Sequence, residues 1–232
     1  MATYSISKTF KWRGTVTDKV ASVCRMFGLT LGRLTEQRFT HACRLEIEAG
    51  DIVYLAGPSG AGKSVLLAEL EKVVPAGDRI NLAEIPLPAD RTLIDCISAG
   101  GRLTADADLM ASLRFLSVAG LNDCFCILNQ PVNLSAGQQY RFRLAMALAA
   151  KKKFVFADEF CSELDSVTAA VISYRLHRFA KRTGTTFILA SSRDDILLDL
   201  VPDVLVVKQL SGPAEVIYRR KASHSGKHTR SE

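Results

Sequence analysis

The chain has 232 residues, of which 48% are hydrophobic and 23% are charged, and its formal net charge is +6. This length and composition allow one sizeable core, and they exclude a disordered or fibrous chain. The longest apolar run on a predicted helix, residues 144–150, is too short to cross a bilayer, which takes about 20 residues. Because residues 1–13 also lack the apolar core of a signal peptide, we expect a cytoplasmic protein.

After an opening strand, residues 17–27 have the pattern of an amphipathic helix. Its apolar positions are Val20, Val23, Cys24 and Phe27. The simplest expectation is that these side chains pack on the core of the domain. A binding role for this helix is the less favoured alternative.

Apolar runs of strand length then alternate with amphipathic helical segments along the chain. The predicted strands are residues 45–47, 52–56, 154–157, 187–191, 204–207 and 216–218. A helix is well signalled between Asp165, which can cap its start, and Gly184, which can end it. Residues 91–132 break this rhythm with helical patterns and are predicted to form an inserted lobe. The alternation predicts an α/β fold with a largely parallel sheet.

Residues 219–232 form a basic segment that is rich in Ser and His. They hold five basic residues and one acidic residue, so the rest of the chain has a net charge of only +2. We expect this segment to be a solvated, disordered tail. Attraction to nucleic acid or to anionic lipid is the alternative.

A glycine-rich loop joins the predicted strand 52–56 to the helix-forming residues 65–70. The loop is Gly57-Pro58-Ser59-Gly60-Ala61-Gly62-Lys63-Ser64. This spacing is that of a phosphate-binding loop, whose glycines let backbone N–H groups turn toward phosphate oxygens at a helix N-terminus. Lys63 is then expected on the β- and γ-phosphates of ATP, and the Ser64 hydroxyl on Mg²⁺.

Two adjacent carboxylates end the apolar strand at 154–157. Acids at the tip of a buried strand cost desolvation energy unless a cation or hydrogen-bond donors meet them. In a phosphate-loop ATPase, the first acid, Asp158, holds Mg²⁺, and the second, Glu159, polarises the attacking water. Capping of the next helix is the alternative role, and the phosphate loop upstream favours the catalytic one.

The sequence LSAGQ precedes that strand and opens a helix that is predicted at 139–150. The order GPSGAGKS, LSAGQ, FVFADE and then SELD resembles the nucleotide-binding domain of the ATP-binding cassette (ABC) superfamily, over residues 5–218. The resemblance implies that Ser135, Gly137 and Gln138 bind the γ-phosphate of ATP that is held on a second subunit. Taken alone, LSAGQ also fits a serine that caps a helix.

This resemblance implies a P-loop NTPase fold of ABC type, with a mostly parallel core sheet, an antiparallel β part and an inserted helical lobe. Residues 1–218 are expected to form one such domain, with the lobe at about 91–132 and the tail at 219–232. Two copies would face each other head to tail, with two ATP molecules between them. Residues 162–165 resemble the family's D-loop, which runs along this homodimer interface.

Two departures from the family pattern concern the γ-phosphate. The family's glutamine is replaced by Glu84, which can bind Mg²⁺ but cannot donate a hydrogen bond. The family's histidine is replaced by Ser192, which is shorter and cannot become cationic. Arg193 could reach in instead, although a surface arginine is the more common case. The predicted catalytic set is therefore Lys63, Glu159 and Ser192, with slow hydrolysis and intact ATP binding.

The family stacks adenine on an aromatic residue near the end of the first strand, where this chain has Phe10 and Trp12. We favour Phe10 as the adenine-binding residue because it follows the segment 7–9, and either ring could instead belong to the core. Trp12 is the only tryptophan of the chain, so an ATP-dependent change in its fluorescence would separate the two.

Two uses of such an ATPase compete. The short lobe, the missing glutamine and the extra helix at 17–27 favour a soluble ATPase whose dimerisation switches a partner, with nucleic acid as a candidate. Residues 26–29 and 205–212 are similar to ABC-type ATPases that are fused to acetyltransferase-like domains. The alternative is the ATP-binding subunit of a transporter, which works with a separate membrane permease. A third candidate is an inert adaptor that keeps the fold without turnover.

Overall fold

The computed structural model describes residues 2–97 and 105–219. Most of the predicted tail, residues 220–232, therefore lies outside the described residues, and so does part of the predicted lobe, residues 98–104. Within the described ranges, no helix combines the length and the apolar character that a bilayer span needs.

A six-stranded sheet forms the centre of the molecule, with the strand order β4-β5-β6-β3-β7-β8. Its strands are β3 (Ile52–Ala56), β4 (Arg79–Asn81), β5 (Phe154–Ala157), β6 (Thr186–Ala190), β7 (Val204–Val207) and β8 (Glu215–Tyr218). All neighbouring pairs are parallel except β7 and β8, which are antiparallel. The predicted, largely parallel sheet is confirmed. The pattern did not reveal β4, because this strand is only three residues long.

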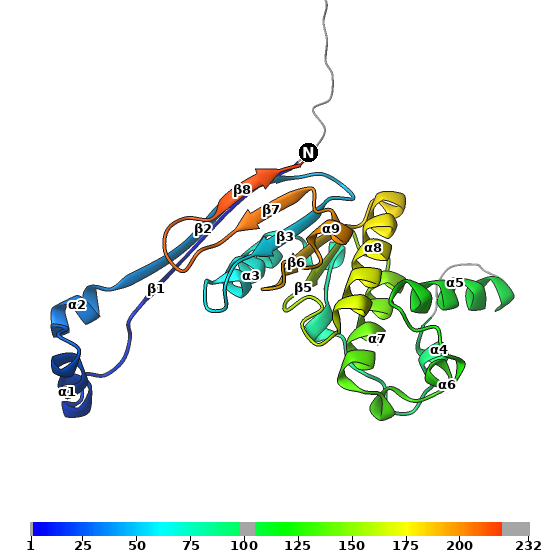
Figure 1. The fold of residues 1–232 in the computed structure, drawn as a ribbon, viewed down its shortest axis with the longest axis horizontal. Helices are drawn as coiled ribbons and strands as arrows, with labels where there is room; N and C mark the ends of the chain where they lie inside the picture. Colours follow the sequence, from blue (N-terminus) through cyan, green and yellow to red (C-terminus); the bar gives the residue numbers. More distant parts are fainter. Residues whose placement is uncertain (1, 98–104, 220–232) are drawn as a thin grey trace, which may run out of the picture.

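Alternation of side chains along β3 separates two hydrophobic cores. Val53 and Leu55 belong to a core that is shared with α3 (Lys63–Val73). Ile52 and Tyr54 belong to the larger core, which includes residues of α7 (Ala136–Ala149) and α8 (Ser166–Thr183). Figure 1 shows α3 and α8 on opposite sides of these strands. The sheet is therefore covered on both faces, as its continuous apolar strands require.

The helices match the sequence prediction in kind and differ from it in their bounds. α8 has Asp165 as its N-cap and Gly184 in a left-handed conformation at its end, as predicted. α7 begins at Ala136 rather than at the predicted Gln139, because Ser135 caps it. The other helices and 3-10 turns are α4 (Leu93–Cys96), α5 (Ala105–Val118), α6 (Cys124–Ile127), α9 (Leu197–Leu200), η1 (Ala76–Asp78), η2 (Leu82–Glu84) and η3 (Pro131–Asn133). The described part of the predicted lobe is helical.

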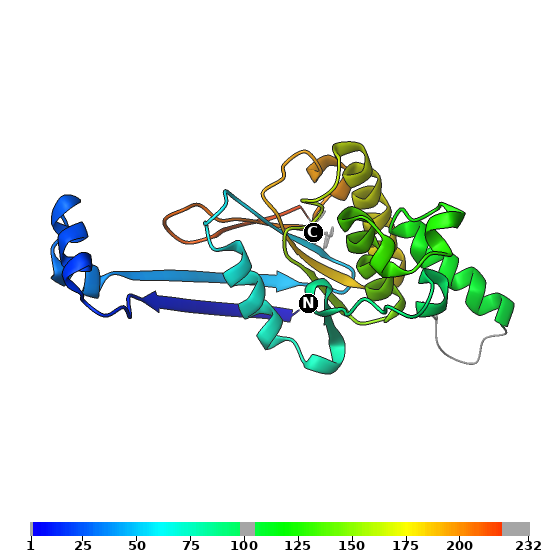
Figure 2. The same cartoon turned by 90° about the horizontal axis from the view of Figure 1, so that it is seen from below.

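The first two strands form a separate antiparallel arm. β1 (Ala2–Lys11) pairs with β2 (Arg38–Ile47) along its whole length. At the far end of the arm, α1 (Asp18–Met26) and α2 (Leu31–Glu36) form a small helical unit, well away from the central sheet (Figures 1 and 2). We call residues 12–37 the arm tip.

The helix predicted at 17–27 is present as α1, but the expectation that it packs on the core is wrong. Val23 and Phe27 are 53% and 77% exposed, and Cys24 is the buried residue of α1. The reason is the length of β1 and β2, which carry α1 beyond the body of the domain. Among the described residues, the apolar side of α1 therefore contacts mainly the rest of the arm tip.

Candidate nucleotide-binding site

The phosphate loop connects the carboxyl end of β3 to α3, as the sequence predicted. Gly57 has a φ of 143°, and a Cβ there would lie 2.0 Å from the Lys208 carbonyl oxygen. Gly62 caps α3 at a φ of 95°, and a Cβ there would lie 2.3 Å from the His41 ring. Only glycine fits these two positions, so the loop backbone stays close to a helix N-terminus, where an anion is stabilised. The other loop residues before Lys63 are exposed Pro58, Ser59 and Gly60 and buried Ala61.

Lys63 is a buried cation that neutral groups hold inside the loop. Its ammonium group donates to the carbonyl oxygens of Gly57 (2.8 Å) and Pro58 (3.0 Å) and to the Ser192 hydroxyl (2.9 Å). The residue is only 5% exposed, and no carboxylate within residues 2–97 and 105–219 forms an ion pair with it. A buried ammonium group without a counter-charge attracts an anion such as a phosphate.

The predicted acidic residues follow β4 and β5, at the same edge of the sheet as the phosphate loop. Asp158 directly follows β5, and its carboxylate accepts a hydrogen bond from the backbone N–H of Glu159 at 3.0 Å. Glu159 is exposed and has a φ of 48°, an uncommon backbone conformation for a residue with a side chain. Glu84 ends η2, just after β4, and is also exposed. Strand order thus places both acidic segments next to each other.

Magnesium binding at this edge depends on the nucleotide. Among the described residues, no cluster of three or more His, Cys, Asp or Glu side chains can hold a metal ion. Mg²⁺ is usually held by one or two carboxylates together with substrate phosphates, so a cage made by the protein alone is not required. Ser64, which is exposed, and Asp158 are oxygen donors that fit this arrangement, and Glu84 is a third donor at the same edge.

The LSAGQ segment begins α7 and has the geometry of a capping box. The Ser135 hydroxyl accepts a hydrogen bond from the Gln138 backbone N–H at 3.3 Å, and the Gln138 side chain accepts one from the Ser135 N–H at 3.0 Å. Gly137 lies against the predicted D-loop, where a Cβ would be 3.2 Å from a methyl carbon of Leu164. Ser135 is exposed. The segment therefore caps its own helix and still presents the helix N-terminus to a second molecule.

Arg193 has a structural role that sequence reasoning missed. Its guanidinium donates to the carbonyl oxygens of Cys161 (2.9 Å) and Leu164 (2.5 Å), and it pairs with Asp195 at 2.6 Å. It thereby fixes the predicted D-loop to the segment after β6. Arg193 is therefore not a free surface residue, and its guanidinium is directed at these carbonyl oxygens. The hydrogen bond from Arg193 lowers the pKa of Asp195 to about 2. No local pattern around residue 193 could have indicated this contact.

Of the two aromatic residues that were considered for adenine, Phe10 lies beside the phosphate loop. Its ring meets the His41 ring edge to face, with centroids 5.9 Å apart, and His41 lies against Gly62. Trp12 instead lines a cavity in the arm tip.

Sequence reasoning missed His41, because a single histidine on a strand carries no signal. Its Nδ1 is buried without a hydrogen-bond partner among the described residues, and burial, together with Lys208, lowers its pKa.

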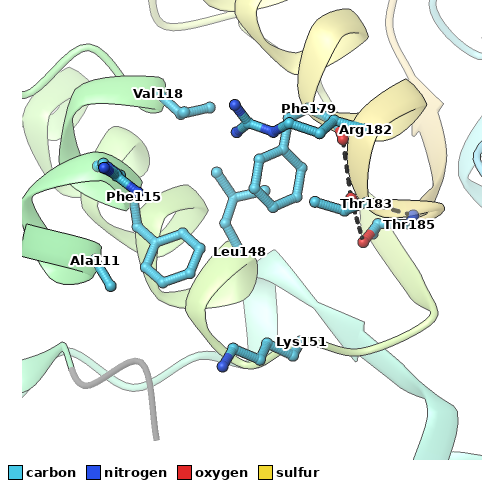
Figure 3. Close-up of a pocket in the computed structure, with 10 residues that line it drawn as sticks. Ala111, Phe115, Val118, Leu148, Lys151, Phe179, Arg182, Thr183 and Thr185 are labelled. Carbon is cyan, nitrogen blue, oxygen red and sulfur yellow. Dashed lines mark hydrogen bonds between the residues drawn. The ribbon is translucent and has the colours of Figure 1, made fainter. Parts of the chain in front are cut away.

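A cavity of about 640 Å³ lies between α5, α7 and α8 (Figure 3). Phe115 of α5, Leu148 of α7 and Phe179 of α8 give it an apolar wall. Lys151 and Thr185, which also line it, precede β5 and β6. The phosphate loop and the predicted catalytic residues follow the carboxyl ends of the strands, so this cavity is separate from the candidate nucleotide site.

Known proteins resemble this chain across the residues of the site. Residues 40–162, which contain the phosphate loop, LSAGQ and the two carboxylates, match the family profile described as ABC transporter. The chain is 28% identical over 218 residues to the methionine import ATP-binding protein MetN of Sodalis glossinidius, covering 78% of this chain and 63% of that protein. It is 29% identical over 194 residues to MetN 2 of Pseudomonas aeruginosa, covering 71% and 57%. The chain thus spans less than two thirds of the length of either relative.

Solved structures match the fold. The dimeric structure of MJ0796, a bacterial ABC transporter cassette, has a TM-score of 0.61 at 21% identity and covers 82% of this chain and 95% of that one. A structure of MJ0796 in a post-hydrolysis state, bound to ADP and phosphate, has a TM-score of 0.59 at 22% identity, with 77% and 89% covered. These matches confirm the predicted fold of a cassette with a mostly parallel sheet, an antiparallel β part and helices.

Proposed function

Because the chain belongs to the ABC transporter family, we propose that it is the ATP-binding subunit of a transporter and works with a separate membrane permease. Its fold is that of an ABC-type ATPase, and the relatives named above are ATP-binding proteins of methionine import. These comparisons favour the transporter role over the soluble role that we expected from the short lobe and the missing glutamine. The proposal includes a position at the cytoplasmic face of the membrane, where ATP is supplied.

The environment of Lys63 is the observation that carries the ATPase assignment. Its ammonium group is buried among carbonyl oxygens and the Ser192 hydroxyl, and no described carboxylate neutralises it. A triphosphate supplies the missing negative charge, and the N-terminus of α3 adds its partial positive charge. We assign Lys63 and the loop backbone to the β- and γ-phosphates of ATP, and Phe10 to the adenine ring.

The catalytic roles follow from the exposed residues around that loop. Glu159 is exposed next to Asp158, so its carboxylate can accept a proton from the attacking water. The Ser192 hydroxyl accepts a hydrogen bond from Lys63, and in this proposal it donates its own proton to the γ-phosphate. Bound Mg²⁺ would be held by Ser64 and Asp158, with Glu84 as a further donor, and would neutralise charge on the phosphates.

A second copy of the chain completes the site in this proposal. α7 follows its N-cap Ser135 and carries Gly137 and Gln138 in its first turn. This helix is far from the phosphate loop in the sequence. In a head-to-tail homodimer, this helix N-terminus would meet the γ-phosphate of ATP held on the other copy. The dimeric cassette structure of MJ0796 supports the arrangement. ATP binding and dimerisation are then linked, because each stabilises the other.

Glu159→Gln tests this assignment most directly. The substitution keeps the shape of the side chain and removes the base, so we expect hydrolysis to fall by about a hundredfold or more while ATP still binds. The variant should accumulate as a dimer in Mg-ATP, measured by light scattering during size-exclusion chromatography. Lys63→Ala is the matched control, which should stay monomeric because it does not bind the nucleotide. The same oligomeric state in all forms, with and without ATP, would favour the inert adaptor.

Hydrolysis by the unmodified chain should be slow. A serine at position 192 offers one hydrogen bond to the γ-phosphate and cannot carry a positive charge. Phosphate release in steady state measures the rate, and Ser192→His should raise it. Turnover as fast as that of the fast transporter ATPases would contradict this part of the proposal.

The soluble switch is a second candidate function, and the replacement of the family's glutamine by Glu84 is the observation that favours it. Affinity purification of the Glu159→Gln variant from native membranes and cytosol separates the two candidates. An integral membrane permease supports the transporter role, whereas nucleic acid or a soluble enzyme, such as an acetyltransferase-like protein, supports the switch.

A further inference from the structure

The arm tip exposes more apolar side chain than its two short helices can cover. Its exposed large apolar residues are Val16, Val23, Met26, Phe27, Leu29 and Leu31. Cys24 is the buried residue of α1, and α2 buries none. Met26 is 82% exposed, although α1 is a capped and amphipathic helix. An exposed apolar surface of this kind marks a contact surface.

A groove of about 420 Å³, lined by residues of α1, of α2 and of the segments beside α1, continues this surface. Its lining includes Trp12, Val20, Cys24, Leu29 and Leu34. Lys19 is the charged residue of an otherwise apolar lining. Trp12 therefore faces the same surface as the two helices.

Basic residues are frequent in the arm tip and directly beside it in the sequence. The arm tip contains four basic and two acidic residues, a net charge of +2, and one further basic residue flanks it on each side. The basic residues are Lys11, Arg13, Lys19, Arg25, Arg33 and Arg38. All six are exposed, and none forms an ion pair with a carboxylate of the described ranges. The charge of the tip is complementary to an anionic partner.

We propose that the arm tip docks on a membrane surface that carries anionic lipid headgroups. Basic side chains around aromatic and aliphatic ones are typical of segments that lie in the bilayer interface, where the apolar side enters and the cations meet headgroups. Contact with a nucleic-acid backbone would pair with the cations and leave the aliphatic side chains, such as Met26 and Leu29, without an apolar partner.

The shape of the molecule supports the same occupant. The tip stands at the end of the arm, away from the central sheet, so it can reach a flat surface before the other described parts of the chain do (Figures 1 and 2). The inference goes beyond the proposed function, since it concerns lipid rather than a permease. If it fails, the assignment of the ATP site is unaffected.

Trp12 reports directly on this docking, because it is the only tryptophan of the chain and lies at the tip. The full chain is mixed with vesicles of phosphatidylcholine and phosphatidylglycerol, or of phosphatidylcholine alone. We expect a blue shift of the Trp12 emission and co-sedimentation with the anionic vesicles, both weakened by salt. Absence of both effects would overturn the proposal.

Paired variants locate the contact. Met26→Ser with Phe27→Ser should weaken vesicle binding by about a hundredfold, because two large apolar side chains no longer leave water. The control is Phe125→Ser with Leu128→Ser, which changes two exposed apolar residues near α6 and should bind as the unmodified chain does. Neutralising Arg13, Lys19 and Arg25 with glutamine should also cost about a hundredfold.

Three outcomes would assign the surface elsewhere and overturn the proposal. The first is unchanged vesicle binding by the variant of Met26 and Phe27, with circular dichroism and ATP binding showing that it is folded. The second is binding that disappears only when the basic residues after 219 are neutralised. The third is self-association without vesicles that the same variant abolishes in sedimentation velocity, which would make a second copy the occupant.

Discussion

The phosphate loop holds a buried, hydrogen-bonded cation, whereas the arm tip, at the far end of the arm, exposes large apolar side chains to water. Phe10 and His41, near the outer end of the arm, connect the two, since the His41 ring lies against Gly62. At the loop, Lys63 is 5% exposed and makes three hydrogen bonds. At the tip, large apolar side chains such as Phe27 are mostly in water.

This difference follows from the kind of partner that each region suits. A small anion is bound tightly only if its donors are held in place beforehand, so the loop must be rigid before the nucleotide arrives. An extended surface gains its energy from area that is still exposed in the free protein. The two regions should therefore differ in local stability, with the tip opening much more readily than the loop.

Gly57→Ala should give the largest effect and test the rigidity of the loop. A Cβ there would lie 2.0 Å from the Lys208 carbonyl oxygen at a φ of 143°, so β3 and β7 must separate or the loop must move. We expect a loss of about 3 kcal/mol or more in the free energy of unfolding. Urea unfolding and ATP binding measure it. Gly28→Ala in the arm tip, at a φ of 65° with no atom within 4 Å, is the control and should cost about 1 kcal/mol.

Under native conditions, the alkylation rate of Cys24 should be about a hundredfold higher than that of Cys161. Both thiols are buried, Cys24 in the tip and Cys161 beside the predicted D-loop, so static burial alone predicts similar rates. Burial raises the pKa of the Cys161 thiol to about 12, so its reactive thiolate forms at neutral pH only when that region opens. Mass spectrometry after iodoacetamide treatment compares the two, and equal rates would remove the contrast. Anionic vesicles should protect Cys24 only.

The same contrast explains how much of the fold could be predicted from sequence. Residues 52–64 correctly predicted a strand, a loop and the start of a helix, and residues 154–157 correctly predicted a strand. The apolar strands and the glycines of the phosphate loop satisfy requirements that are local in the sequence. The helix at 17–27 was also predicted, but its partner was not. Periodicity says which side of a helix is apolar and not what that side contacts. The ten-residue pairing of β1 with β2 decides where α1 lies.

The candidate site divides in a similar way. Lys63 and Ser192 are far apart in sequence, and their hydrogen bond fits the expectation that both act at the γ-phosphate. His41 and Arg193 could not be predicted, because each depends on contacts between distant segments. His41 faces the loop only through the register of the arm, and Arg193 reaches Leu164 only because β6 lies beside β5. The roles of Glu84 and Phe10 stay predictions until nucleotide binding is measured.

Arg193→Met should destabilise the protein by about 2 kcal/mol, because two carbonyl oxygens of the D-loop segment lose a charged donor. The methionine keeps most of the apolar stem, so packing changes little. Thermal unfolding measures the loss, and Asp195→Asn is a control that keeps those two hydrogen bonds. An unchanged melting temperature would mean that the D-loop is held by other contacts.

The same pair carries a pH dependence. The pKa of Asp195 is lowered to about 2 by Arg193, below its value of about 3.9 in an unfolded chain. Its contribution to stability is therefore present above pH about 4 and is lost as the pH falls toward 2. Arg193→Met should flatten this part of the stability profile, whereas variants of the arm tip should leave it unchanged.

Phe27→Ser should give the smallest effect on stability and sharpen the comparison most. The ring is 77% exposed, so its removal should change the free energy of unfolding by less than about 0.5 kcal/mol. Phe160→Ser, at a fully buried ring directly after Glu159, is the matched control and should cost about 3 to 5 kcal/mol. Urea midpoints compare the two. A large loss for Phe27→Ser in dilute solution would mean that another surface of protein already covers the tip, and a membrane would then have no apolar face to bind.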